Sequence, residues 1–249
     1  SSLAEGLTLA AIPTREDPRD CILTKEKIDF KSLKKNAIIG TSSVRRAAQF
    51  LRICPDARIK NLRGNVDTRI KKLVSGHYDA IIVALAGLKR LGYTHAEAFY
   101  TEAPPPTGGG ASVRSEEERF FIRPFPLTLM VPACGQGALG IEIRSDDQQV
   151  YELARKINDE KSFFCVQCER AFLKEFGAGC RIPLGALAKI KGARIHLIIC
   201  VTSLDGKKII SLSQKAGVHE AEALGKRLAR EVFKKAGKEI LQGVRNLKK

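Results

Sequence analysis

Between residues 36 and 92, short apolar segments alternate with helical patterns, and this order restricts the chain to few folds. We expect strands at Asn36–Gly40, Ala57–Leu62 and Tyr78–Ala84, and the last is nearly all apolar, as a strand buried on both faces should be. The segments after the first two strands repeat apolar residues at helical spacing, at Val44, Ala47, Ala48 and Leu51 and then at Val66, Ile70, Leu73 and Val74. This order predicts a βαβαβ unit with a parallel sheet and right-handed crossovers.

Each of these strands is followed by a loop of small or polar residues: GTSS at 40–43, LRGN at 62–65 and ALAG at 84–87. Because ligands of open α/β sheets bind at the carboxyl ends of the strands, the three loops should converge on one site. Arg45 and Arg46 lie in the first turn of a helix, where the positive end of the helix dipole disfavours a cation by about 0.3–1 kcal/mol. Their position therefore requires an anion that neutralises them.

The arginines near these loops indicate a site for a polyanion. A guanidinium group can bind a carboxylate or a phosphate with two parallel hydrogen bonds. The full set would be Arg45, Arg46, Arg63, Arg69 and Arg90. Hydroxyl donors would be added by Thr41, Ser42 and Ser43, beside the free N–H groups of the helix N-termini. The alternative is that some of these arginines pair with Asp67 or Asp79, or face water.

Charge and composition limit the partners. The chain has 43 Lys and Arg against 27 Asp and Glu, and its net charge of +16 predicts acidic ligands. Aromatic residues make up only 6% and Trp is absent, so surfaces for base stacking are sparse and we expect no nucleic-acid partner. No apolar run approaches the ~20 residues of a membrane span, and no basic leader precedes an apolar stretch at the N-terminus. We therefore expect neither a membrane partner nor secretion.

The seven cysteines are odd in number and irregularly spaced, which favours reduced thiols in a cytoplasmic protein. Cys165 and Cys168 form a CxxC in the middle of a helical pattern, without a second pair, so we expect packing and no metal site. Cys180 lies in the loop GAGC beside Arg181, whose charge would lower the pKa of the thiol. From the residues alone, a reactive thiol and an incidental one are equally open.

Two further regions differ in composition. Residues 96–130 include EAPPPTGGGASVRSEEER, which is dense in Pro, Gly and charge, and we predict a flexible insertion there. The last ninety residues predict a small α+β domain: a helix at Ser162–Phe176, strands at Pro183–Ile190, Arg194–Thr202 and Ile209–Gln214, and helices at His219–Ala236 and Glu239–Asn246.

Five sequence blocks, in order, resemble the porphobilinogen deaminase (hydroxymethylbilane synthase) family: GTSSVRRAAQF, NLRGNVDTR, YDAIIVALAGLKRLG, CGQGALGIEIR and ERAFLKEFGAGCRIPLGA. REDPRD near the start also fits, and the resemblance covers nearly the whole chain except about residues 96–130. It implies a transferase of tetrapyrrole, porphyrin and heme biosynthesis that joins four porphobilinogen units into linear hydroxymethylbilane and releases ammonia. A dipyrromethane cofactor, held by a thioether to a cysteine, primes that reaction in the family.

The resemblance assigns roles to the residues singled out above. Cys180 would be the covalent anchor of the dipyrromethane. The other cofactor-binding residues would be Thr41, Ser42, Ser43, Arg45, Arg46 and Gly87. The substrate-binding residues would be Arg63, Arg69, Arg90, Asn65 and Gln136, the last in a GQG turn near a hinge.

The family fold implied is α/β: parallel-sheet lobes of the periplasmic-binding-protein type and a small C-terminal α+β domain. Residues 1–18 and 133–157 would be a remnant of domain 1, 19–130 domain 2, and 160–249 the C-terminal domain. The family's catalytic Asp belongs to a motif of the type Lys-Asp-(Val/Leu)-Pro that would precede Ser1, so no residue of this chain is assigned catalysis. We therefore expect this chain to behave as a fragment with little turnover, rather than as a degenerate paralogue.

Two other functions stay open at this level. A non-catalytic polycarboxylate-binding module of the periplasmic-binding-protein type would carry nothing on Cys180. A basic nucleic-acid binder would show an affinity that falls steeply with salt. The resemblance itself suggests a monomer that acts on porphobilinogen in the cytoplasm, with a plastid location left open.

Overall fold

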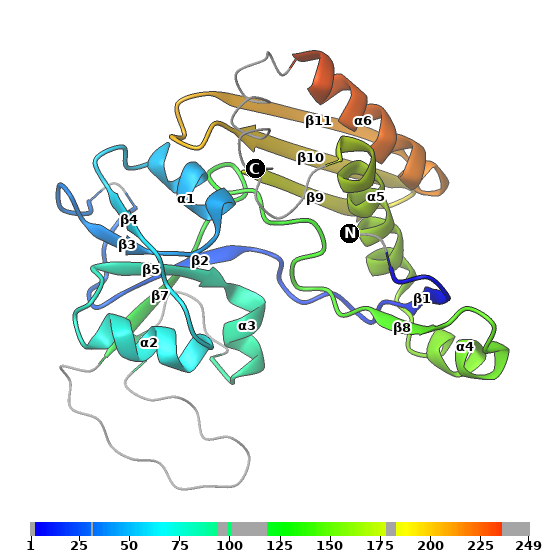
Figure 1. The fold of residues 1–249 in the computed structure, drawn as a ribbon, viewed down its shortest axis with the longest axis horizontal. Helices are drawn as coiled ribbons and strands as arrows, with labels where there is room; N and C mark the ends of the chain where they lie inside the picture. The colour runs from blue at the N-terminus through cyan, green and yellow to red at the C-terminus, as the bar shows by residue number, and fades with distance from the viewer. Residues whose placement is uncertain (1–2, 31, 94–98, 101–118, 178–182, 236–249) are drawn as a thin grey trace, which may run out of the picture. The chain divides into compact units, whose positions relative to one another are not determined.

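A computed structural model describes residues 3–30, 32–93, 99–100, 119–177 and 183–235 of the chain. The chain forms two compact units (Figure 1). Unit 1 comprises residues 1–18, 131–201 and 209–249, and unit 2 comprises residues 19–130 and 202–208. No helix in the described part is long and apolar enough to cross a bilayer.

Unit 2 is built on a six-stranded sheet with the order β4-β3-β5-β2-β7-β6. Its strands are β2 (Asp20–Thr24), β3 (Ile38–Gly40), β4 (Arg58–Lys60), β5 (Ala80–Ala84), β6 (Phe99–Tyr100) and β7 (Phe120–Pro124). β3 pairs in parallel with β4 and β5, which confirms the predicted βαβαβ unit. β2 pairs antiparallel with β5 and β7, so the sheet is mixed and not parallel throughout.

Helices cover both faces of this sheet: α1 (Val44–Leu51), α2 (Val66–Val74) and α3 (Leu85–Arg90). Successive residues of a strand point to opposite faces, and those of β5 therefore enter two different cores. Ile81 and Val83 pack with residues of α2 and α3. Ala80 and Ile82 pack with Phe50 of α1. As Figure 1 shows, α1 lies on one face of the sheet and α2 and α3 lie on the other.

The structure corrects the predicted flexible insertion at 96–130 in its last part. Phe120–Pro124 forms β7, and Phe120, Phe121 and Ile122 are buried. The short aromatic run FFIRPF is typical of a buried strand, but the Pro, Gly and charged residues before it dominate the composition of the segment. The PPPTGGG stretch lies outside the described residues.

Unit 1 contains two sheets. β1 (Leu7–Ala11) pairs antiparallel with β8 (Ile141–Arg144), and α4 (Gln148–Arg155) packs against them. The second sheet has the order β11-β10-β9 and consists of β9 (Leu184–Lys191), β10 (Arg194–Thr202) and β11 (Ile209–Gly217). It is joined by α5 (Glu160–Phe176), the 3-10 turn η2 (Val218–Glu220) and α6 (Ala221–Lys235). This agrees with the predicted α+β pattern; the helix expected at 239–246 lies outside the described residues.

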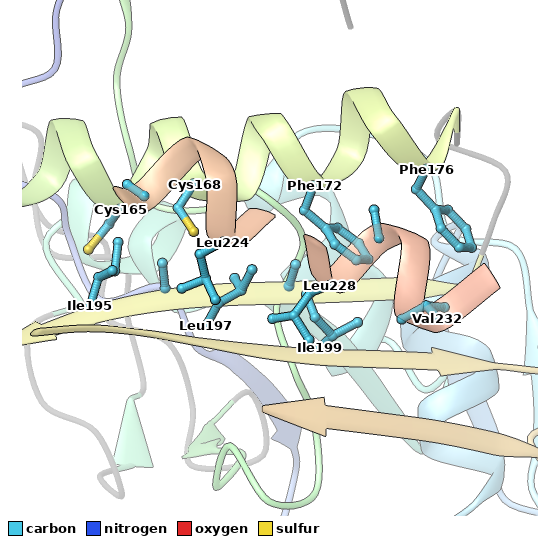
Figure 2. Packing of buried hydrophobic residues seen from close by; sticks show 14 of the residues in the cluster. Cys165, Cys168, Phe172, Phe176, Ile195, Leu197, Ile199, Leu224, Leu228 and Val232 are labelled. Carbon is cyan, nitrogen blue, oxygen red and sulfur yellow. The ribbon is translucent and has the colours of Figure 1, made fainter. Parts of the chain in front are cut away.

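The core of unit 1 forms between α5, α6 and one face of the second sheet (Figure 2). β10 contributes the alternate residues Ile195, Leu197 and Ile199, and α6 contributes Leu224, Leu228 and Val232 at helical spacing. The two helices lie very close at Gly225, where an added Cβ would come within 2.4 Å of the carbonyl oxygen of Cys168. Gly225 is therefore required by the close approach of the two helix backbones.

The CxxC of α5 belongs to this core. Cys165 and Cys168 are buried in the core, which confirms that they pack there. Burial raises the pKa of the Cys165 thiol to about 11 and that of Cys168 to about 12, and the carboxylate of Glu169 adds to both shifts. A thiol reacts as its thiolate, so both groups are inert in the folded chain.

We expect Phe172→Ala to lower the free energy of unfolding by about 3–5 kcal/mol, because Phe172 is fully buried in this core and its removal leaves a cavity. Phe233→Ala is the matched control, because Phe233 is 40% exposed although it stacks on Phe176. Urea unfolding followed by circular dichroism measures both. Equal losses for the two variants would contradict the assignment of Phe172 to the core.

Candidate functional site

The loops after β3 and β4 are held together by Ser42. Its hydroxyl group contacts the side-chain oxygen of Asn61 and the carbonyl oxygen of Leu62, and it accepts a hydrogen bond from the N–H of Leu62 at 3.2 Å. Because β3 and β4 are parallel, both loops leave the same edge of the sheet. The structure therefore brings together two of the three loops that the sequence predicted to converge.

The polar residues at the ends of these loops cap the two helices. Ser43 is the N-cap of α1 and accepts a hydrogen bond from the N–H of Arg46 at 3.4 Å, and the hydroxyl of Thr41 accepts one from the N–H of Ser43 at 3.2 Å. Asn65 is the N-cap of α2 and accepts from the N–H and the hydroxyl of Thr68 at 2.9 and 2.7 Å. Such caps stabilise a helix by about 0.5–2 kcal/mol, so these residues have a structural task before any ligand is considered.

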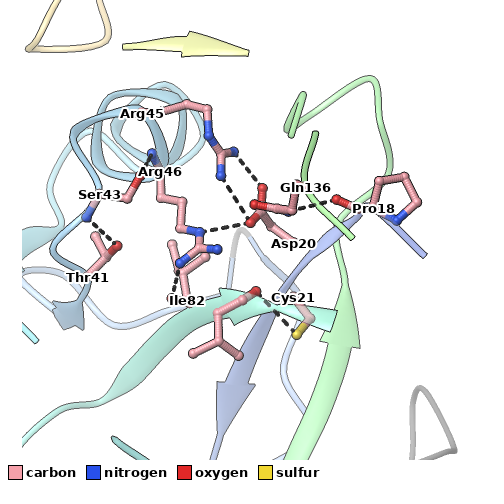
Figure 3. Close-up of polar contacts among 10 residues, drawn as sticks. Pro18, Asp20, Cys21, Thr41, Ser43, Arg45, Arg46, Ile82 and Gln136 are labelled. Carbon is pink, nitrogen blue, oxygen red and sulfur yellow. Dashed lines mark hydrogen bonds and ion pairs between the residues drawn. The ribbon is translucent and has the colours of Figure 1, made fainter. Parts of the chain in front are cut away.

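The arginines at the start of α1 bind Asp20, the first residue of β2 (Figure 3). Arg45 places its two terminal nitrogens 2.6 and 3.2 Å from the two carboxylate oxygens, and the Nε of Arg46 lies 2.8 Å from one of them. Asp20 is completely buried and Arg45 is 4% exposed. Asp20, and neither Asp67 nor Asp79, is therefore the anion that answers the two cations at the positive end of the α1 dipole.

Sequence reasoning missed this role of Asp20, although REDPRD contains it. The sequence did contain a signal: two adjacent arginines in the first turn of a helix need a carboxylate nearby. The cluster of Asp20, Arg45 and Arg46 carries one net positive charge, so it favours an anion nearby. Burial lowers the pKa of Arg46, and the charge of Arg45 adds to that shift while attraction to Asp20 opposes it.

The other predicted binding residues of unit 2 are spread more widely. Arg63 follows β4 and is exposed, and the Nε of Arg69, one turn into α2, donates to the carbonyl of Gly64 at 2.7 Å. Arg90 is the last residue of α3, about 9 Å along the helix from its N-cap Ala84 at 1.5 Å per residue. Gly87 lies within α3 and not in the loop before it.

Gln136 lies in unit 1, where it joins two segments of the chain. Its side-chain Nε2 donates to the carbonyl of Pro18 at 2.7 Å (Figure 3), and its own carbonyl accepts from the Nε of Arg15 at 2.9 Å. Gly137 beside it has φ +82°, and an added Cβ would lie 2.6 Å from the carbonyl oxygen of Glu16. Residues 15–18 and the GQG turn are therefore packed backbone against backbone.

A second buried carboxylate, Glu169 of α5, was also missed by sequence reasoning. It binds Arg15 through both oxygens, at 2.6 and 3.1 Å, and accepts from the N–H groups of Gly135 and Ala188 at 2.6 and 2.8 Å. Burial raises the pKa of Glu169, and all of these donors oppose that shift. Glu169 thus ties together α5, β9, the GQG turn and residue 15.

Cys180, the predicted anchor of the cofactor, lies outside the described residues. The described part of the chain ends at Gly177 and resumes at Pro183. None of the six cysteines that the structure describes forms a disulfide bond. Within the described ranges no group of three or more His, Cys, Asp or Glu could hold a metal ion.

We expect Asp20→Asn to destabilise unit 2 by about 3–5 kcal/mol, because it leaves the buried Arg45 without a full counter-charge. Asp67→Asn is the matched control, since Asp67 is exposed in the first turn of α2 and should cost about 0.3–1 kcal/mol. Thermal unfolding followed by circular dichroism measures both. If Asp20→Asn unfolds like the control, the buried cluster does not hold the unit as described.

A similar pair tests Glu169. We expect Glu169→Gln to cost about 3–5 kcal/mol of unfolding free energy, because the Arg15 guanidinium beside it is also mostly buried. Glu175→Gln, on the same helix, breaks an exposed pair with Arg230 and should cost about 0–1 kcal/mol. Urea titration of the two variants against the unmodified chain gives the comparison, and equal midpoints would contradict it.

Comparison with known proteins identifies the family of the chain. The family model described as porphobilinogen deaminase, dipyromethane cofactor binding domain, matches residues 1–152, and that of the porphobilinogen deaminase C-terminal domain matches residues 163–234. A porphobilinogen deaminase of Syntrophomonas wolfei is 39% identical over 241 residues, which cover 97% of this chain and 71% of that protein. One of Listeria monocytogenes serotype 4a is 38% identical over 247 residues, covering 99% and 72%.

A solved ABC transporter / periplasmic binding protein from Brucella ovis, with glutathione bound, shares 14% identity and a TM-score of 0.34, over 70% of this chain and 45% of that chain. This similarity is too weak to support an argument, so the fold is assigned from the strand order described above. The two family models and the curated relatives confirm what the five sequence blocks predicted: the chain belongs to the porphobilinogen deaminase family.

Proposed function

We propose that the edge of the sheet beyond β3 and β4 holds the carboxylates of porphobilinogen and of the growing pyrrole chain. As a member of its family, the chain is a hydroxymethylbilane synthase, a transferase of tetrapyrrole and heme biosynthesis that joins porphobilinogen units into hydroxymethylbilane with release of ammonia. The observation that carries the proposed site is the cluster of Arg45, Arg46 and Asp20 at the N-terminus of α1. It combines net positive charge with the positive end of a helix.

The residues of this edge fit the dipyrromethane cofactor of the family, whose rings carry acetate and propionate groups. Guanidinium groups, hydroxyls and helix N–H groups are the donors that carboxylates accept best. Thr41, Ser42, Ser43 and Arg46 would hold those carboxylates, with Arg45 behind them. When bound through Cys180, the cofactor supplies the pyrrole to which the first substrate unit is joined.

The described residues act by binding and orienting. Arg45, almost fully buried on Asp20, fixes the start of α1, while Arg46 is the more exposed of the pair, with 13% of its side chain accessible. The carboxylates of incoming substrate would be held by Arg63, Arg69, Arg90 and Asn65. Gln136 would orient the turn in which it lies. Holding charged substrates in one geometry lowers the barrier chiefly through positioning and fixed electrostatics.

Several finer assignments belong to the same proposal. Residues 1–18 with 133–157, 19–130 and 160–249 would correspond to three domains of the family. The chain would act as a monomer in the cytoplasm, without a nucleic-acid partner.

Two arginines near opposite ends of β4 test the site. We expect Arg63→Leu to weaken porphobilinogen binding about tenfold or more, because a hydrogen bond to a charged group contributes about 1.5–3 kcal/mol. Arg58→Leu removes the same charge at the other end of the strand and should leave the affinity unchanged. Isothermal titration calorimetry with porphobilinogen measures both, and equal affinities would contradict the placement of the site.

The mass of the purified, denatured chain tests the anchor. We expect an adduct of two linked pyrroles that peptide mapping places on Cys180, lost in Cys180→Ser and kept in Cys134→Ser. A bare thiol in a chain that still binds porphobilinogen would favour the polycarboxylate-binding module instead.

A further inference from the structure

Residues 202–208, the turn between β10 and β11, belong to unit 2. The chain passes from unit 1 into unit 2 at Thr202 and returns after Lys208. Most of this turn is exposed, but Gly206 at its tip is buried, and Thr202 at its base is 1% exposed. A buried tip on an otherwise exposed turn means that the tip is pressed against another part of the chain.

Gly206 lies on the C-terminal half of α1. An added Cβ would come within 2.5 Å of the carbonyl oxygen of Ala48, 3.0 Å of the N of Arg52 and 3.2 Å of the Cβ of Leu51. The first two of these atoms belong to the backbone and cannot move aside. Gly206 also has φ +73°, a conformation that other residues adopt only with strain. Position 206 therefore requires glycine for both its conformation and its contact.

The turn is ordered by its own hydrogen bonds. The N–H of Ser203 donates to the carbonyl of Lys208 at 2.9 Å, and the N–H of Lys208 donates to the hydroxyl of Ser203 at 2.9 Å. The carboxylate of Asp205 accepts from the N–H of Lys207 at 3.1 Å. These hydrogen bonds hold the turn in a single conformation.

We propose that Gly206 is a positioning residue: its turn clasps the C-terminal end of α1 and thereby holds Arg45 and Arg46 in place on Asp20. α1 has only eight residues and is about 12 Å long, so a displacement at one end reaches the other. The ion pairs at its start span 2.6–3.2 Å and tolerate little displacement. The effect of this contact on ligand binding rests on the proposed function.

Two glycines in the turns before and after β10 provide the test. Gly206→Ala adds a Cβ against α1, whereas Gly192→Ala, in the turn between β9 and β10, adds one at φ +60° with nothing within 4 Å. Hydrogen exchange followed by mass spectrometry should show α1 exchanging about tenfold faster or more in Gly206→Ala, with α2 unchanged, and no change at α1 in Gly192→Ala. Unchanged exchange at α1 in Gly206→Ala would overturn the clasp.

Calorimetry with porphobilinogen then separates the clasp from the proposed function. We expect the dissociation constant to rise about tenfold in Gly206→Ala and to stay constant in Gly192→Ala. Faster exchange at α1 with an unchanged dissociation constant would overturn the positioning role. If the unmodified chain fails to bind porphobilinogen, the proposed function fails, while the exchange data still decide the clasp.

A measurement on the unmodified chain covers the case in which Gly206→Ala does not fold. The amides of Ser203, Gly206 and Lys208 should exchange slowly, at rates like those of α1. Rates equal to those of the exposed turn at Gly192 would overturn the proposal.

Discussion

The buried contact of Asp20 with Arg45 and Arg46 is the interaction on which unit 2 depends most. A carboxylate and a guanidinium without water around them are costly unless each finds good partners. Asp20 meets this condition because it lies at the start of β2, beside α1. Both of its carboxylate oxygens accept hydrogen bonds from guanidinium groups there. The same contact compensates for the unfavourable position of two cations at the start of the helix. It fixes their side chains and leaves one net positive charge there.

Unit 1 repeats this solution with different residues. Glu169 has no exposed surface, and both of its oxygens accept from two donors each. In both units a buried carboxylate joins segments that are far apart in the sequence. Apolar packing alone would allow those segments to slide, whereas a bidentate ion pair accepts one geometry.

The sequence predicted the part of the fold that local patterns determine. The βαβαβ unit follows from helical spacing and from the apolar strand at 78–84, and the C-terminal α+β pattern follows in the same way. β2 and β7 escaped prediction because they pair antiparallel with strands distant in sequence, and no local pattern reports such pairing. Asp20 and Arg45 are 25 residues apart, and no periodicity reports such a pair. The adjacent arginines predicted that an anion was needed but not which one.

The link that Ser42 makes between two loops has a thermodynamic consequence. Together with the caps at Ser43 and Asn65, it orders both loops while the chain folds, before a ligand arrives. The conformational entropy of these loops is then already lost in the free protein, so little of it remains to oppose binding. Association of a carboxylate at this edge should therefore resemble docking onto a rigid surface, with a small entropic penalty and little backbone rearrangement.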